Sequence, residues 1–145
     1  MTPTPLAAAV DLPLGLEAAG LARRTVAQLL RGWHVDDDAW TDDVLLVTSE
    51  LVTNAVRHGG HRVRLDLQLD ADHLRVAVSD GSSVLPAQRA DEQDESGRGL
   101  AIIAALAASW GVEARADGGK TVWVRLAVPV AATPAPFLDG DAAPA

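Results

Sequence analysis

Three segments of this chain alternate between apolar and polar residues at every second position. They cover residues 62–69, 74–78 and 121–128. A period of two is typical of strands whose sheet buries one face against a core and leaves the other partly in water. Strands of this kind belong to antiparallel or mixed sheets rather than to fully buried parallel ones. The apolar face of such a sheet needs a second layer to cover it.

Helical periodicity elsewhere in the chain supplies that second layer. Two further short strands are predicted at residues 9–14 and 110–116, and amphipathic or apolar helices at residues 16–30, 37–57 and 99–109. Helices that share one core with largely antiparallel strands form a two-layer arrangement. The sequence therefore predicts an α+β fold, a two-layer α/β sandwich with helices on one face of a mixed, largely antiparallel sheet.

The length of 145 residues corresponds to one domain. We expect the domain to span residues 10–128. The segments 1–9 and 129–145 are rich in Pro and Ala and are predicted to be disordered. No internal repeat and no second domain is expected.

The acidic composition argues against direct nucleic-acid binding. The formal net charge is -8, whereas affinity for a phosphate backbone comes from clustered Lys and Arg. No apolar run approaches the length of a membrane span, and the N-terminus lacks the basic and apolar regions of a secretory signal. Cysteine is absent, which excludes disulfides and thiolate metal sites. We expect a cytoplasmic protein without membrane attachment.

A polar stripe runs along the central predicted helix. Glu50, Asn54 and His58 are spaced four residues apart, so they share one face of the helix. Asn is a poor residue for a helix interior, because its side chain competes for backbone groups. Taken alone, the stripe is explained by a solvated surface or by a functional face.

Three glycine-containing segments follow this helix, and each has an ordinary explanation as well. Asp80-Gly81 ends a core strand and can present a carboxylate to an amine or simply form a turn. Gly97-Arg98-Gly99-Leu100 opens the last predicted helix, where backbone N–H groups can bind an anion or the chain can need a flexible start. Residues 118–121, Gly-Gly-Lys-Thr, lead into the last predicted strand. They are explained equally well as part of a functional site and as an ordinary hairpin turn.

The order and spacing of these segments resemble the GHKL family of ATP-binding proteins, which includes gyrase, histidine kinases and mismatch-repair ATPases. The sequence is most similar to the small bacterial anti-sigma-factor serine kinases and their stand-alone actinobacterial relatives. The likeness runs from about residue 10 to 128. It rests on the motifs at residues 49–59, 78–80 with Pro86, 97–100, 109–111 and 119–123. The resemblance implies the Bergerat-type ATP-binding fold of that family.

The resemblance also implies roles for individual residues. Asn54 matches the family's Mg²⁺ ligand beside the triphosphate, and Glu50 matches the carboxylate that orients or deprotonates the attacking group. Asp80, followed by Gly81, matches the residue that binds the adenine amine. The remaining nucleotide-binding positions implied by the resemblance are Arg57, His58, Gly97, Arg98, Gly99, Leu100 and Thr121.

Two features depart from the family pattern. The family has Asp-x-Gly-x-Gly after the base-binding Asp, whereas this chain has Asp80-Gly81 followed by Ser-Ser-Val, which implies a stiffer loop and weaker affinity. The segment 87–96, expected as a lid, carries four carboxylates at positions 91, 92, 94 and 95 against one Arg. Those charges are unfavourable beside a triphosphate unless Mg²⁺ or Arg98 offsets them.

The resemblance implies an ATP-dependent serine/threonine protein kinase of the anti-sigma-factor type, with ATP and Mg²⁺ as cofactors. Its implied partners are a sigma factor and an anti-anti-sigma (STAS-type) protein, and a homodimer is compatible with the likeness. The alternative is a nucleotide-sensing module that holds a partner without phosphoryl transfer. A histidine-kinase catalytic domain or a gyrase-type ATPase is not expected, because the sequence shows neither a dimerisation helix nor a transducer domain.

Overall fold

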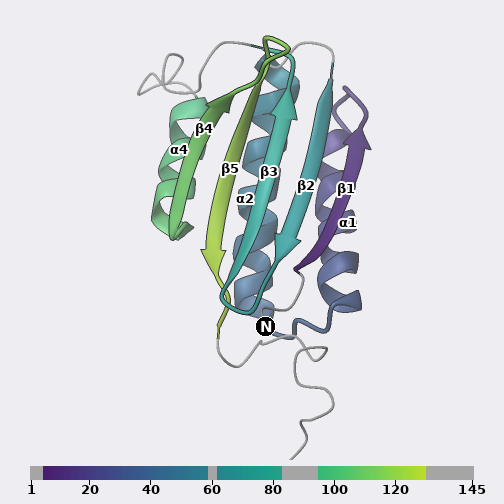
Figure 1. Ribbon diagram of the computed structural model, residues 1–145, viewed down its shortest axis with the longest axis vertical. Coiled ribbons are helices and arrows are strands. Elements are labelled where there is room, and N and C mark those ends of the chain that lie inside the picture. Colours follow the sequence, from purple (N-terminus) through teal and green to yellow (C-terminus); the bar gives the residue numbers. More distant parts are fainter. Residues whose placement is uncertain (1–4, 59–61, 83–94, 130–145) are drawn as a thin grey trace, which may run out of the picture.

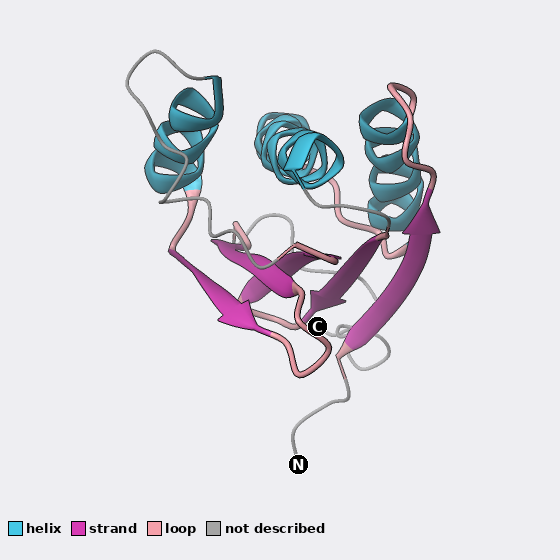
Figure 2. Ribbon diagram, turned by 90° about the horizontal axis from the view of Figure 1, so that it is seen from above, coloured by secondary structure: helices cyan, strands magenta, loops and turns pink. Residues whose placement is uncertain are grey.

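A single open sheet forms one layer of the molecule, and helices cover one of its faces (Figures 1 and 2). The computed structural model describes residues 5–58, 62–82 and 95–129. Within these residues the sheet has the strand order β1-β2-β3-β5-β4, and every neighbouring pair is antiparallel. The predicted α+β sandwich is confirmed. The sheet, predicted to be mixed and largely antiparallel, is antiparallel in all of its described pairings.

The strands of the sheet follow the predicted alternation closely. Their bounds are β1 Leu6–Leu12, β2 Val63–Leu69, β3 His73–Asp80, β4 Ser109–Ala114 and β5 Lys120–Ala127. Along β2, every apolar residue is buried and every polar residue is partly or fully exposed. Each buried Leu or Val contributes about 1.5–3 kcal/mol relative to an exposed one. The helix-facing side of the sheet is therefore the main part of the core.

Three helices of the described chain lie on that face: α1 Ala18–Gly32, α2 Asp38–His58 and α4 Glu95–Leu106. Figure 2 shows α2 in the middle, between the other two. The start of α2 is capped by Asp37, whose carboxylate accepts from the backbone N–H of Trp40 at 2.9 Å. The Trp40 indole N–H in turn donates to the carbonyl oxygen of Ala127 at 2.7 Å, which ties the start of α2 to the end of β5.

Element boundaries differ from the predictions at two places that matter. Strand β1 begins at Leu6 rather than at residue 9, because Leu6 pairs with Leu69 of β2, so the expected boundary of a disordered terminus lies inside a strand. Helix α4 begins at Glu95, four residues before its predicted start. Predictions for residues 1–4 and 130–145, and for the lid up to residue 94, fall outside the described residues.

Candidate functional site

Elements that are distant in sequence meet at one end of the molecule, at the top of Figure 1. Helix α2 ends there, strand β3 ends there, and both strand β5 and helix α4 begin there. The sheet register places Asp80 opposite Val63 on one side and opposite Lys120 on the other. Every described residue of the predicted site lies on one of these elements or directly beside them.

The middle of this region is the contact between α2 and the first turns of α4. Gly99 is buried, and a β-carbon at its position would lie 2.7 Å from Oε2 of Glu50 and 3.7 Å from Nδ2 of Asn54. A glycine thus allows the α4 backbone to approach the polar stripe of α2. The structure brings Glu50, Asn54 and Gly99 together from two helices.

The early start of α4 changes the position of the predicted glycine segment. Gly97, Arg98, Gly99 and Leu100 lie within the first turn and a half of the helix rather than ahead of it. The first four N–H groups of an α-helix have no carbonyl partner within the helix, and in α4 these belong to residues 95–98. Together with the positive end of the helix dipole they form a favourable place for an anion.

Arg57 and His58 lie in the last turn of α2, at the same end as Asp80. Arg57 is exposed and His58 is half-buried. Basic residues are favourable at the negative end of a helix dipole. Their placement therefore has a structural explanation in addition to the predicted nucleotide contact.

A buried ion pair joins the end of β3 to the start of β5. The Lys120 ammonium lies 3.0 Å from Oδ1 and 2.9 Å from Oδ2 of Asp80, and the side chains of Asp80 and Lys120 are only 2% and 5% exposed. The backbone N–H of Ser82 donates to Oδ1 at 2.8 Å. Sequence reasoning predicted Asp80 but treated Lys120, the chain's one lysine, as part of a turn. Its strand position, opposite Asp80 in the register, was the missing signal.

Thr121 is on the other face of the sheet. Successive side chains of a strand point to opposite faces, and Lys120 shares the helix-facing side with Val122 and Val124. The Thr121 hydroxyl forms a 2.8 Å hydrogen bond with the Ser79 hydroxyl, and Arg115 Nη1 lies 3.4 Å from each. The structure therefore does not bring Thr121 together with the Asp80 carboxylate.

Gly119 is held against the end of β3. A β-carbon at Gly119 would collide with the carbonyl oxygen of Asp80 and lie 3.1 Å from Cα of Gly81. The backbone carbonyl cannot move aside without shifting β3. Glycine at 119 is therefore required for the close approach that sets the Asp80–Lys120 pair, a role that the sequence did not reveal.

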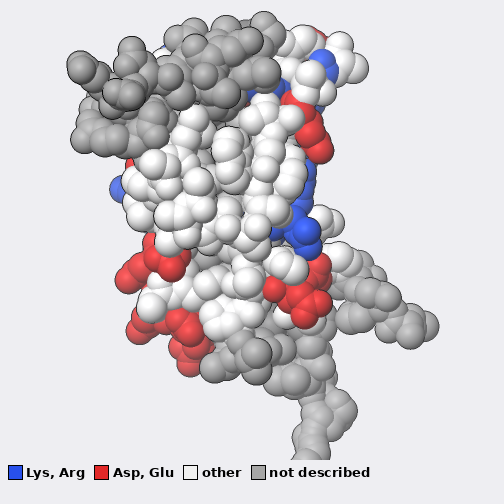
Figure 3. Space-filling view, turned by 90° about the vertical axis from the view of Figure 1, so that its left-hand side faces the viewer, with Lys and Arg blue, Asp and Glu red and all other residues white. Residues whose placement is uncertain are grey.

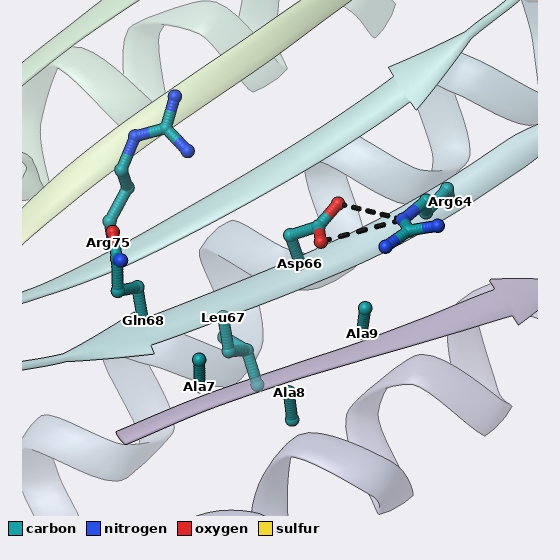
Figure 4. Close-up of a pocket in the computed structure, with 8 residues that line it drawn as sticks. All are labelled: Ala7, Ala8, Ala9, Arg64, Asp66, Leu67, Gln68 and Arg75. Carbon is teal, nitrogen blue, oxygen red and sulfur yellow. Dashed lines mark hydrogen bonds and ion pairs between the residues drawn. The ribbon is translucent and has the colours of Figure 1, made fainter. Parts of the chain in front are cut away.

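Two hollows are present on the uncovered face of the sheet. One, of about 330 Å³, is lined by Arg62, Arg64, Ser79, Asp80, Gly81, Arg115 and Asp117. The other, of about 480 Å³, is lined by residues of β1, β2 and β3 and contains the ion pair between Arg64 and Asp66 at 3.3 Å (Figure 4). Of the predicted site residues, only Asp80 and Gly81 line either of these two hollows.

One cluster of carboxylates lies at the other end of α2 from Asn54. Five carboxylates surround the start of α2, at positions 36, 37, 38, 42 and 43. Figure 3 shows carboxylates toward the lower end of the molecule and others near its upper end, with a broad uncharged surface over α4 and β4 between them. At 1.5 Å per residue, Asp38 and Asn54 are about 24 Å apart along the helix, more than the screening length of about 8–10 Å in physiological salt. These five carboxylates therefore do not oppose a polyanion near Asn54.

Oxygen ligands for a metal are sparse in the described part of the chain. Residues 5–58, 62–82 and 95–129 contain no group of three or more His, Asp or Glu that could hold a metal ion. Mg²⁺ is commonly held by one or two protein oxygens together with substrate phosphates and water. The Asn54 amide beside the start of α4 fits that sparse donor set, with most ligands supplied by a nucleotide.

No helix among the described residues is long and apolar enough to cross a membrane.

Comparison with known proteins agrees with this fold. A family model described as a histidine kinase-like ATPase domain matches residues 12–126. The uncharacterized protein SCO4941 of Streptomyces coelicolor is 41% identical over 76 residues, which cover 48% of this chain and 71% of that protein. A chain in the crystal structure of the SiaB–SiaC complex from Pseudomonas aeruginosa is similar in fold, with a TM-score of 0.56. That likeness covers 86% of this chain and 91% of the other at 14% identity.

Proposed function

The chain belongs to the histidine kinase-like ATPase domain family, and we propose that it is an ATP-dependent serine/threonine protein kinase that regulates a partner protein. Membership of an ATPase domain family implies ATP binding. The observation that carries the proposal is the contact of Glu50 and Asn54 with Gly99, at the end of the molecule where Asp80 also lies.

Each residue has a distinct role in the proposed reaction. Asp80 accepts a hydrogen bond from the adenine amine, and the first N–H groups of α4 bind the phosphates. Asn54 supplies an oxygen to Mg²⁺, which offsets negative charge on the phosphates when bound. Glu50 takes the proton from a Ser or Thr hydroxyl of the partner. The oxygen of that hydroxyl attacks the γ-phosphorus, and ADP leaves. Glu50 is half-buried on α2, where a hydroxyl can reach it.

A protein substrate of the anti-anti-sigma (STAS) type is the proposed partner, with a sigma factor as a second one. The chain is similar in fold to a protein chain from a two-protein complex, that of SiaB and SiaC, which supports a role that involves a partner protein. We place this activity in the cytoplasm, and a homodimer is compatible with it.

A second candidate function is a nucleotide-sensing module that holds its partner without phosphoryl transfer. The two departures from the family pattern favour it: the irregular sequence after Asp80 and the four carboxylates at positions 91, 92, 94 and 95. Transfer of ³²P from γ-labelled ATP to a STAS-domain protein separates the two candidates. Labelled partner with the wild type, and none with Glu50→Gln, supports the kinase. ATP binding without label in either supports the sensor.

The site itself is tested by calorimetry with Mg·ATP. Asn54→Ala should abolish detectable binding, whereas Thr53→Ala, one residue away on the same helix, should bind as the wild type does. Circular dichroism and thermal unfolding show whether both variants keep the fold. Unchanged affinity in a folded Asn54→Ala protein would remove Asn54 from the site.

A further inference from the structure

The Asp80–Lys120 pair has hydrogen-bonding capacity left over. The Asp80 carboxylate accepts from the Ser82 N–H and the Lys120 ammonium at Oδ1, and from Lys120 again at Oδ2. A carboxylate offers about four acceptor positions and an ammonium three donors. Three acceptor positions and two donors are used. Among the described residues, one acceptor position on Oδ2 and one N–H on Nζ therefore remain, and these two atoms are 2.9 Å apart.

The ammonium cannot simply leave when a base arrives. Both side chains are almost fully buried, and a buried carboxylate that loses its cation is strongly destabilised. The amino group of a purine is neutral, so it does not replace the lost charge. A bound base must therefore add to the pair and not displace Lys120, and the flexible lysine stem allows the small adjustment that this requires.

We propose that Lys120 is a specificity-determining residue of the nucleotide site and that, with Asp80, it reads the base as a donor–acceptor unit. Oδ2 accepts from the 6-amino group of adenine, and Nζ donates to a ring nitrogen next to that amino group. This inference rests on the proposed ATP site and adds to it a second group that recognises the base. A lone carboxylate would recognise the amino group only.

Nucleotide analogues test this in the wild-type protein. In 1-deaza-ATP and 7-deaza-ATP, one of the two ring nitrogens that flank the amino group is replaced by carbon. A site with a buried donor rejects the analogue that leaves it unpaired. We expect one of the two analogues to bind about tenfold more weakly than ATP, as for a lost hydrogen bond to a charged group. Equal calorimetric affinity for ATP and both analogues would overturn the inference.

Lys120→Met, which keeps the length of the stem and removes the donors, gives a second test. The variant should bind ATP about tenfold more weakly and should no longer discriminate against the deaza analogue. Arg125→Met, on the same strand but on the exposed face, is the matched control and should retain wild-type discrimination. Discrimination retained in a folded Lys120→Met protein would contradict the inference.

The outcomes separate this inference from the proposed function. If the folded wild type binds no ATP, the proposed function and the inference both fail. If it binds ATP but does not discriminate against either analogue, the nucleotide site stands and the role of Lys120 falls. If Lys120→Met does not fold, the analogue series in the wild type still decides.

Discussion

Glu50 of α2 and Gly99 of α4 are packed so closely that a β-carbon on Gly99 would lie 2.7 Å from the Glu50 carboxylate. The nearest atoms belong to the free end of a flexible side chain, so the carboxylate can move and the helices need not. This relationship joins the proposed catalytic base to the proposed phosphate-binding helix. A side chain at position 99 should therefore displace the Glu50 carboxylate without disturbing the packing of the two helices.

Gly99→Ala should therefore reduce activity without reducing stability. Alanine improves the helix by up to about 1 kcal/mol, whereas displacement of the Glu50 carboxylate by about 1 Å should lower phosphoryl transfer tenfold or more. Thermal unfolding and ³²P transfer measure the two effects. Gly20→Ala in α1, where a β-carbon has room, is the control and should gain stability with unchanged transfer. Full activity in Gly99→Ala would argue against Glu50 as the base.

The buried Asp80–Lys120 ion pair should contribute more to the free energy of unfolding than an exposed ion pair does. Lys120→Met leaves the Asp80 carboxylate buried without its cation, and should cost about 3–5 kcal/mol in the free energy of unfolding in urea. Arg64→Met breaks the ion pair between Arg64 and Asp66, in which the two side chains are 50% and 38% exposed. This variant should lose at most about 1 kcal/mol in the free energy of unfolding.

The double variant Asp80→Asn with Lys120→Met checks the cause of that loss. It should recover part of the stability, because no unpaired charge remains buried. If the double variant loses as much as the sum of the single variants, the two groups do not interact energetically.

Gly119→Ala should destabilise the end of the sheet. Its β-carbon would collide with the backbone carbonyl of Asp80, which cannot rotate away, and overpacking of this kind costs about 1–3 kcal/mol. Gly32→Ala at the end of α1, with nothing within 4 Å, should change stability by less than about 1 kcal/mol. Urea unfolding compares the two, and equal effects would mean that the β-strands shift freely.

Asp70 should make stability fall in acid. Partial burial acts to raise the pKa of its carboxyl, but N–H donation from His73 and Asp72, with the charges of His73 and Arg125, outweighs it and lowers the pKa. A carboxyl with a lowered folded-state pKa stabilises the fold above its unfolded pKa, near 3.9, and loses that contribution as pH falls through the folded value. Relative to Asp70→Asn, the wild type should be more stable at pH 7.

This advantage should shrink below about pH 4, where the carboxyl begins to protonate. Urea unfolding of both proteins between pH 7 and pH 2 measures it. An advantage that stays constant down to pH 2 would show that the Asp70 charge contributes nothing.

Much of the fold could be predicted because its signals are local. The alternation in residues 62–69 and 121–128 reports which side chains are buried, and the structure buries those side chains. The start of β1 could not be predicted, because a short Ala-rich segment becomes a strand only by pairing with β2. The start of α4 was missed because Gly97 and Gly99 resemble a loop, although packing against α2 keeps the segment helical.

The sequence by itself determined which residues share a helix face or a strand face, since these follow from periods of 3.6 and 2 along the chain. Glu50 and Asn54 on one stripe of α2 were evident in this way. Only the tertiary structure decided which residues from different elements meet. The register sets Lys120 against Asp80 and turns Thr121 to the opposite face, a choice that a shift of one residue would reverse. That pairing depends on the close approach at Gly119, a contact between distant segments that no local pattern encodes.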